Sequence, residues 1–313
     1  SVDGEEASMI LQSINNSIFK KPETLISNYI AIEKYFHFIN SSKLKLLPNT
    51  FIPKLLTNIK SKAKYTIYKD NFWRAFEFIP NSESHTKIIS FDIAKSLGNG
   101  LASFHNVFKD FNSKNVIPSI SCFHNLDYYL LLFDKAINKY SLENKSPIVK
   151  ENLVYVIKKI QNNREHYSKY YKSIDSLDIT KCLIHADPKV SNFLFDDKSL
   201  SVKSIIDLDT ISYDNILYDI CDCLRSACNT LGEDSIEFNL VEFDLQILER
   251  VIQGYYSGSS NLLQKKDFHC LPKFLELVTY ELSIRFVTDF MCGNKYFQVD
   301  HSLTNLFRSI TQL

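Results

Sequence analysis

The feature that most constrains the fold is a polar loop, residues 185–192, enclosed by short apolar segments. Residues 182–184 lead into this loop, and the apolar residues that follow Asn192 leave it. After a turn, residues 202–206 run back to Asp207. Short apolar runs bounded by turn residues are typical of buried strands. Such a chain brings the polar side chains at the strand ends together in one place.

Asp187 and Asn192 lie in this loop with the spacing His-x-Asp-x-x-x-x-Asn, and Asp207 lies at the end of the returning strand. A carboxylate here can orient an acceptor hydroxyl and take its proton, which predicts Asp187 as the catalytic base of a phosphoryl transfer. An amide oxygen and a second carboxylate suit Mg²⁺, which predicts Asn192 and Asp207 as metal ligands. We expect His185 to brace the loop. The alternative is a polar hairpin loop with an exposed Asp and Asn.

The composition argues against some functions. The chain has 313 residues, of which 45% are hydrophobic and 23% charged, as in soluble globular proteins. Basic and acidic residues balance at 36 each, which argues against a nucleic acid or an anionic membrane as partner. The sequence shows no apolar run of about 18 residues and no signal peptide at its start. We therefore expect a cytoplasmic protein with a small-molecule substrate.

The seven cysteines carry little functional information. Their number is odd, and no pair has the two-residue spacing of a zinc knuckle. We expect buried, reduced thiols of a cytosolic protein. A zinc or redox role for Cys221 and Cys223 is the alternative.

The apolar pattern changes along the chain. Residues 8–14 predict a strand, and residues 64–68 and 72–79 predict a hairpin. A helix between them begins near Pro22. Helical spacing then dominates, in segments at about 93–108, 125–141, 148–173, 213–230, 239–258 and 271–292. This order predicts an α+β fold with a small strand-containing N-terminal part and a larger, mostly helical C-terminal part, divided near residues 80–90.

Several segments around the polar loop match a known family. The loop carries Lys189 and Pro188, residues 206–210 read Ile-Asp-Leu-Asp-Thr, and residues 218–225 contain Tyr-Asp-x-x-Asp-x-x-Arg. These segments resemble the aminoglycoside phosphotransferase and choline kinase-like family, and most closely its N-acetylhexosamine 1-kinases, in which threonine replaces the proline. The likeness extends to residues 11–19 and covers nearly the whole chain. In those kinases ATP phosphorylates the anomeric hydroxyl of N-acetylglucosamine or N-acetylgalactosamine.

The resemblance implies a protein kinase-like fold with two lobes. Residues 1–80 would form the nucleotide-binding N-terminal lobe, and residues 81–313 the helical C-terminal lobe with the catalytic loop and the substrate site. ATP would be the phosphoryl donor and Mg²⁺ the metal cofactor. The implied nucleotide-binding residues are Gln12, at the position of the protein kinase lysine, and Glu77, Phe78 and Ile79 of the hinge.

The resemblance also implies a substrate site. Its residues are Lys189, Arg285, Tyr296 and Asp209. Arg285 has an alternative partner in Asp289, four residues along the same helix face. Tyr296 could simply pack, Lys189 could be solvated, and Asp209 could reach the metal or cap the following turn. We expect a second group, Asp219, Asp222 and Arg225, to hold the catalytic loop from behind.

Glycine is scarce, and this bears on the N-terminal lobe. The chain has seven glycines, about a third of the number that an average composition would give. In the family a glycine-rich hairpin covers the nucleotide phosphates ahead of the strand predicted at residues 8–14. This sequence lacks that hairpin, so we expect a truncated N-terminal lobe.

The acceptor remains open among several alternatives. An amino sugar is the first hypothesis, because of the residues that resemble the sugar kinases. A kinase of the same fold for an aminoglycoside, choline, ethanolamine or homoserine is the second. A catalytically inactive binding protein is the third, motivated by the missing hairpin. The sequence does not indicate an oligomeric state.

Overall fold

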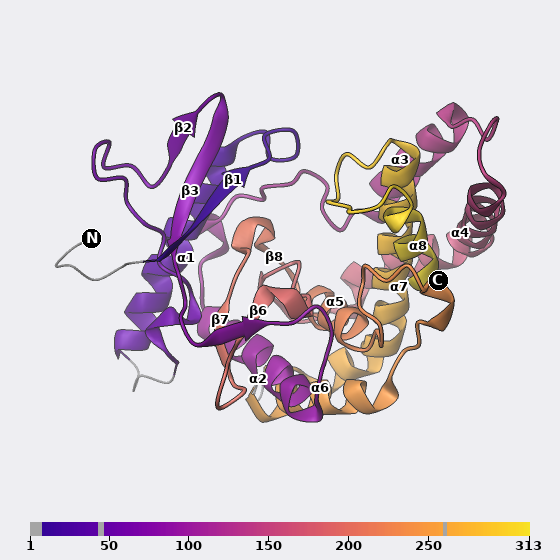
Figure 1. The fold of residues 1–313 in the computed structure, drawn as a ribbon. Helices are drawn as coiled ribbons and strands as arrows, with labels where there is room; N and C mark the ends of the chain where they lie inside the picture. Colours follow the sequence, from indigo (N-terminus) through magenta and orange to yellow (C-terminus); the bar gives the residue numbers. More distant parts are fainter. Residues whose placement is uncertain (1–7, 43–46, 259–261) are drawn as a thin grey trace.

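The computed structural model describes residues 8–42, 47–258 and 262–313 (Figure 1). An antiparallel sheet of strand order β1-β3-β2 lies at the N-terminal end of the molecule. Its strands are β1 (Met9–Ile14), β2 (Thr66–Tyr68) and β3 (Asn71–Glu77). Gln12 of β1 lies opposite Arg74 of β3. The predicted strand and hairpin are therefore confirmed.

Helix α1 (Pro22–Ser42) completes the small N-terminal part. Its apolar residues recur at helical spacing, and one face is buried. Tyr29, Ile32 and Phe36 of this face are at most 3% exposed. The Tyr29 hydroxyl donates to the carbonyl of Pro53 (2.6 Å), which attaches the helix to the loop beside β3.

Two small antiparallel sheets form the centre of the molecule (Figure 1). One has the order β4-β6-β7, with β4 (Ser82–Ser84), β6 (Phe193–Asp196) and β7 (Val202–Ile205). The other pairs β5 (Lys181–Ile184) with β8 (Ser212–Asn215). Because β4 pairs with β6, residues 78–81 link the N-terminal sheet to the central sheets.

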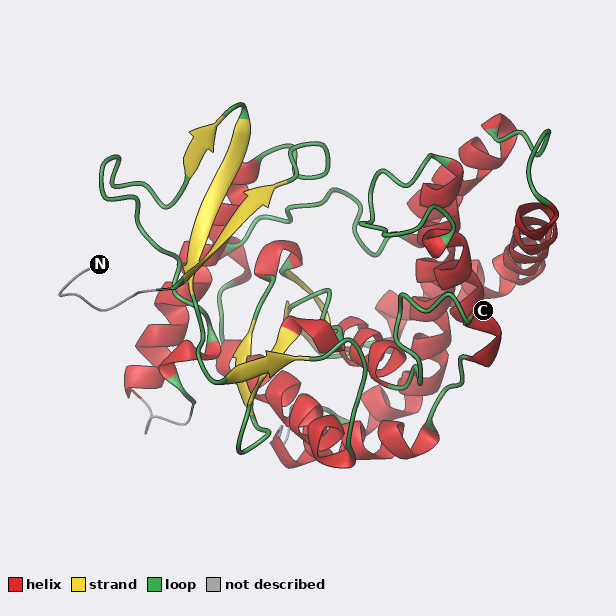
Figure 2. Cartoon of the chain, viewed as in Figure 1, coloured by secondary structure: helices red, strands yellow, loops and turns green. Residues whose placement is uncertain are grey.

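Helices make up most of the larger part (Figure 2). They are α2 (Phe91–Phe108), α3 (Leu126–Lys139), α4 (Pro147–Ser173), α5 (Ile216–Ala227), α6 (Leu245–Gly258), α7 (Lys265–Met291) and α8 (Thr304–Thr311). Helices α2 and α6 cross closely at two glycines. A Cβ atom on Gly98 would lie 2.0 Å from the carbonyl oxygen of Val251, and one on Gly254 would lie 1.9 Å from that of Lys95. Only glycine allows the two backbones to approach in this way.

The α+β fold with two parts is confirmed, and three helix boundaries differ from prediction. Residues 212–215 form strand β8, so α5 begins at Ile216 rather than at residue 213. These residues pair with β5, and strand pairing outweighs local helical preference. Helix α6 begins later than predicted, at Leu245. Helix α7 begins earlier, at Lys265, and continues through Pro272.

The described residues offer neither a membrane span nor a cysteine metal site. No described helix is long and apolar enough to cross a membrane. Within residues 8–42, 47–258 and 262–313, no group of three or more His, Cys, Asp or Glu side chains is arranged to hold a metal ion. Cys221 and Cys223 are buried free thiols, as expected from the sequence. The expectation of buried thiols is wrong for Cys122 and Cys292, which are exposed.

Candidate active site

The start of the catalytic loop is fixed by a buried carboxylate of α5. Asp219 accepts hydrogen bonds from the backbone N–H groups of His185 and Ala186, both at 2.7 Å. Its Oδ2 also accepts from His105 Nε2 (2.9 Å), and His105 Nδ1 lies 2.7 Å from the Tyr255 hydroxyl. These contacts hold Ala186 in a left-handed backbone conformation (φ +66°). The prediction that Asp219 supports the loop from behind is confirmed.

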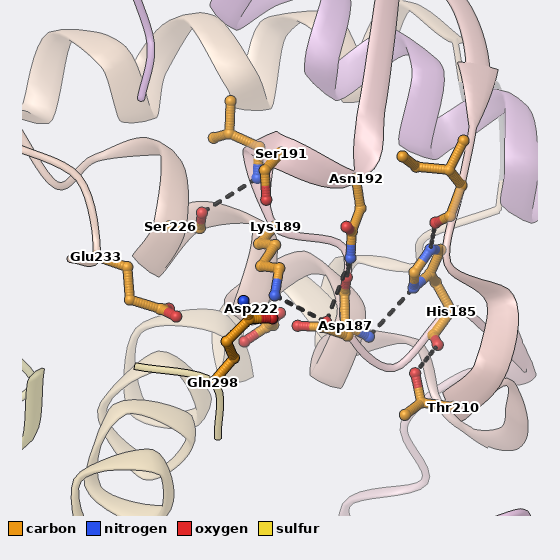
Figure 3. A network of polar contacts seen from close by, with 12 residues as sticks. His185, Asp187, Lys189, Ser191, Asn192, Thr210, Asp222, Ser226, Glu233 and Gln298 are labelled. Atoms are coloured by element: carbon orange, nitrogen blue, oxygen red, sulfur yellow. Dashed lines mark hydrogen bonds and ion pairs between the residues drawn. The ribbon is translucent and has the colours of Figure 1, made fainter. Parts of the chain in front are cut away.

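His185 braces the two ends of the site against each other, as predicted. Its Nε2 lies 2.9 Å from the carbonyl oxygen of Ile206, and its Nδ1 lies 3.3 Å from the backbone N–H of Asp187. A neutral imidazole satisfies both contacts, because Nε2 donates and Nδ1 accepts. The Thr210 hydroxyl donates to the carbonyl of His185 (3.0 Å; Figure 3). The imidazole therefore positions the loop and is not directed at a reacting group.

Asp187, Lys189 and Asn192 converge within the loop (Figure 3). Asn192 Nδ2 donates to the Asp187 carbonyl (2.8 Å) and to Asp187 Oδ2 (3.2 Å). Lys189 Nζ lies 3.3 Å from the same Oδ2, and the nearby carboxylate raises the pKa of this lysine. Within the described residues, Oδ1 of Asp187 and Oδ1 of Asn192 accept no hydrogen bond. Both oxygens are therefore available to a bound ligand or cation.

Asp207 occupies the turn that follows β7. Its backbone is left-handed (φ +63°), and the N–H of the preceding Ile206 donates to the Asn192 carbonyl (2.9 Å). Loss of hydration in the cleft wall and the charges of Asp209 and Asp187 raise the pKa of Asp207 to about 6. A divalent cation would offset this concentration of negative charge. Asn192 Oδ1 and a carboxylate oxygen of Asp207 are two hard oxygen ligands that would suit such an ion.

Arg74, which the sequence analysis did not identify, connects the N-terminal sheet to this site. Its Nη2 lies 2.6 Å from the carboxylate of Asp209, and its Nε and Nη2 donate to Gln12 Oε1 (3.0 and 2.8 Å). Arg74 is 2% exposed and Asp209 is 7% exposed. The available signal was a charged residue in the middle of an apolar strand, since arginine is almost never fully buried without a partner.

Two cavities meet at Gln12 and Asp207. The first, which we call the catalytic cavity, has a volume of about 680 Å³. Predicted residues in its lining are Asp187, Lys189, Asp207, Asp209, Arg285 and Tyr296. The second, the strand-side cavity, has a volume of about 500 Å³ and is lined by the predicted hinge residues Glu77, Phe78 and Ile79. Gln12 and Asp207 line both cavities, and Asn192 lines the second.

Arg285 of α7 lies among aromatic rings in the wall of the catalytic cavity. The centre of its guanidinium lies 4.9 Å from the ring of Phe123, 5.2 Å from Tyr129, 5.4 Å from Phe297 and 5.7 Å from Tyr296. Its Nη2 is 3.5 Å from the Tyr296 hydroxyl. In the part of the chain that the structure describes, no carboxylate forms an ion pair with Arg285. Aromatic rings therefore hold the guanidinium in the cavity wall.

The alternative pairing of Arg285 with Asp289 is not formed. The carboxylate of Asp289 instead accepts hydrogen bonds from the backbone N–H groups of residues 295–297 (2.8–3.0 Å) and from Asn305 Nδ2 (3.0 Å). Asp289 therefore shapes the loop that carries Tyr296, and it leaves the arginine free to face the cavity.

Asp222 and Arg225 line the catalytic cavity as a charged pair. Asp222 Oδ1 accepts from Arg225 Nε (2.8 Å), and Arg225 Nη1 forms an ion pair with Glu233. Burial opposes ionisation of Glu233, but the charges of Arg225 and Lys189 outweigh it and lower its pKa to about 2. Unlike Asp219, these side chains make no hydrogen bond to the catalytic loop. Glu233 was not predicted, since it follows the helix in an irregular segment.

The sequence and the fold were compared with those of known proteins. A family model described as "Phosphotransferase enzyme family" matches residues 45–250. A microcompartment-associated aminopropanol kinase is 17% identical, with a TM-score of 0.59 over 99% of this chain and 84% of that chain. An aminoglycoside phosphotransferase from Alicyclobacillus acidocaldarius is 12% identical, with a TM-score of 0.64 over the same shares.

A third solved structure contains ligands. An amicoumacin kinase in complex with AMP-PNP and Ca²⁺ is 14% identical, with a TM-score of 0.58 over 99% of this chain and 83% of that chain. At these identities the three structures establish the shared fold only.

Proposed function

Because the chain belongs to the phosphotransferase enzyme family and is a small-molecule kinase, we propose that it phosphorylates the anomeric hydroxyl of an N-acetylhexosamine with ATP. The observation that carries this proposal is the arrangement of the catalytic cavity. Asp187, Lys189, Arg285 and Tyr296 all line this cavity. A base in one cavity with the donors Arg285 and Tyr296 suits a hydroxyl acceptor with an acetamido carbonyl and ring hydroxyls.

We place the nucleotide in the strand-side cavity. This assigns residues 1–80 to a nucleotide-binding lobe and residues 81–313 to a lobe with the catalytic loop and acceptor site. The lining of this cavity by Glu77, Phe78 and Ile79 supports an adenine at the segment that links the two parts. Gln12 lies at its border with the catalytic cavity, where the phosphates would pass.

Asn192 and Asp207 fit a Mg²⁺ ion. Both side chains line the strand-side cavity, and loss of hydration, together with the charges of Asp209 and Asp187, raises the pKa of Asp207. Mg²⁺ is commonly held by one or two carboxylates together with substrate phosphates, so the nucleotide would supply further ligands. When bound, the ion neutralises the charge that develops on the transferred phosphoryl group.

Asp187 is the proposed base. Its Oδ2 is held by Asn192 and Lys189, so Oδ1 can accept the hydrogen bond of an incoming hydroxyl. That contact orients the acceptor oxygen in line with the γ-phosphorus. Asp187 takes the proton as the new P–O bond forms and the bond between the γ-phosphorus and the β–γ bridging oxygen breaks, so that ADP leaves. Lys189 remains close enough to offset negative charge on the transferred group.

Arg285 and Tyr296 are the proposed acceptor-binding residues. Arginine donates several hydrogen bonds in a fixed plane, and the surrounding rings restrict its guanidinium. An acetamido carbonyl is a matching acceptor. Asp209 borders the same cavity, but its carboxylate is already paired with Arg74. We therefore propose that Asp209 shapes the cavity wall and contributes to its charge, and does not bind the acceptor directly.

A substrate screen tests the proposal. Purified protein with ATP and Mg²⁺ should convert N-acetylglucosamine or N-acetylgalactosamine to a sugar 1-phosphate, detected by ³¹P NMR. The same screen includes aminopropanol, ethanolamine, choline, homoserine and an aminoglycoside. Transfer to one of these and to no hexosamine would overturn the sugar assignment and leave the kinase assignment standing.

A further inference from the structure

Two buried polar side chains of the catalytic cavity take no part in the mechanism above. Glu281 of α7 is 3% exposed and His124 is 9% exposed, and both line the cavity. His124 Nδ1 lies 3.4 Å from Glu281 Oε1. Within residues 8–42, 47–258 and 262–313, His124 Nε2 and Glu281 Oε2 have no hydrogen-bond partner. Leaving a buried polar atom unpaired is unfavourable, so a ligand that pairs these atoms gains affinity.

The fold holds His124 in place through a strained segment. Cys122 and His124 both have left-handed backbones, with φ of +58° and +54°. The His124 ring stacks on Tyr218 at a centroid distance of 3.9 Å, and the Tyr218 hydroxyl donates to the His124 carbonyl (3.4 Å). Non-glycine residues in this conformation are uncommon and cluster at binding sites. The imidazole is therefore fixed against Glu281 before any ligand binds.

The two unpaired atoms require a particular kind of ligand group. A carboxylate oxygen can only accept a hydrogen bond. A neutral imidazole that carries its proton on Nδ1, toward Glu281, leaves Nε2 as an acceptor as well. Arg285 lies one helical turn beyond Glu281 on α7 and can only donate. Helix α7 thus presents an acceptor at Glu281, beside the acceptor Nε2 of His124, and donors one turn later at Arg285.

We propose that Glu281 and His124 determine acceptor specificity by binding a hydrogen-bond-donating group of the acceptor, while Arg285 binds an accepting group. This inference deepens the proposed function and rests on it. In an N-acetylhexosamine the donating group is a ring hydroxyl remote from the reacting one. An ammonium group of an amino alcohol has the same donor chemistry and adds a charge complementary to Glu281.

The experiment measures kcat and KM for full-length Glu281→Gln and His124→Asn. Asparagine tolerates the left-handed backbone at position 124. Glu276→Gln, an exposed glutamate of the same helix, is the matched control. Each variant is assayed with N-acetylglucosamine, with its 3-, 4- and 6-deoxy analogues, and with 1-amino-2-propanol and ethanolamine. Circular dichroism melts confirm folding.

We expect Glu281→Gln to raise KM for the acceptor about tenfold, with kcat and the KM for ATP within about twofold of wild type. For the wild type, one deoxy analogue should have a KM about tenfold higher than that of the parent sugar. The KM of this analogue should not rise further in Glu281→Gln. That non-additivity identifies the hydroxyl that Glu281 binds. A purely structural role would instead affect all analogues equally.

The two proposals fail in different ways. If the wild type phosphorylates an amino alcohol but no hexosamine, the sugar assignment fails, and a KM rise of about 100-fold for that amine in Glu281→Gln supports the present inference. If both variants match Glu276→Gln on every acceptor that the wild type uses, the inference is overturned while the kinase assignment stands.

Discussion

The two cavities that meet at Asp207 differ in how they are built. The catalytic cavity is lined by charged side chains from several elements, and named groups such as Asp187 and Arg285 face into it. The strand-side cavity is lined largely by apolar side chains and by the segment around Phe78 that links the two parts. Side-chain chemistry therefore dominates the first cavity, and shape dominates the second.

This difference predicts which substitutions should change kcat or KM most. Replacing one group of the catalytic cavity removes a specific interaction with a reacting or charged atom. Replacing one apolar residue of the strand-side cavity changes a fraction of a contact surface. Single substitutions in the catalytic cavity should therefore change kcat or KM more than single substitutions in the strand-side cavity.

The largest effect is expected at Asp187. We expect Asp187→Asn to lower kcat about 10³-fold, because the amide cannot take the acceptor proton. The KM for ATP should change little, since the nucleotide is placed in the other cavity. Asp197→Asn, an exposed aspartate in the turn after β6, is the control and should be fully active. Near-normal turnover by Asp187→Asn would remove this residue from the mechanism.

A large effect on stability is expected at the border between the cavities. Arg74→Gln leaves Asp209 as a buried, uncompensated charge, and we expect it to destabilise the protein by about 3 kcal/mol. Denaturant unfolding measures this change. In the double variant Arg74→Gln/Asp209→Asn the charge is gone, so much of the stability should return. Additive losses in the double variant would mean that the pair is not coupled.

An intermediate effect is expected at Arg285. Lysine keeps the charge but loses the planar fork and the stacking on aromatic rings. We expect Arg285→Lys to raise the acceptor KM about tenfold, measured in steady-state assays. Arg250→Lys is a matched control, because Arg250 also lies over an aromatic ring, Phe91 at 5.4 Å, on another helix. Equal KM values in the two variants would contradict acceptor binding by Arg285.

A smaller effect with a defined pH dependence is expected at Asp207. Its pKa of about 6 exceeds the ordinary value near 4, so the folded state binds the proton more tightly than the unfolded state. Stability of the ligand-free protein should therefore fall as the pH rises from about 4 to 6. Asp207→Asn should remove part of this fall and stabilise the protein at pH 7 by on the order of 1 kcal/mol, since water in the cleft screens the charge. Thermal melts at pH 5 and pH 7 measure this, and a less stable variant at pH 7 would contradict the electrostatic account.

The smallest effect is expected at Phe78. Its side chain is 48% exposed, so truncation removes little buried surface. We expect Phe78→Ala to raise the KM for ATP less than about threefold and to leave kcat unchanged. A tenfold or larger rise would show that a side chain, and not shape and backbone, governs the strand-side cavity.

Much of the catalytic loop was predictable from the sequence. Asp187, Lys189 and Asn192 lie within six residues of one another, and the structure joins them by direct contacts. The bracing by His185 was predictable for the same reason. Apolar periodicity likewise predicted the order of the elements and the α+β fold. These features are local, because a short loop between two strands allows few arrangements of its side chains.

The partners of the other site residues were decided by the tertiary structure alone. Arg74 and Asp209 are 135 residues apart, and His124 and Glu281 lie on different elements. No spacing in the sequence relates such residues, since their contact depends on how the sheets and helices pack. A buried charge must find a partner wherever packing brings one. The sequence by itself therefore determined which groups can carry the chemistry, and the fold decided which of them are paired and which remain free for a ligand.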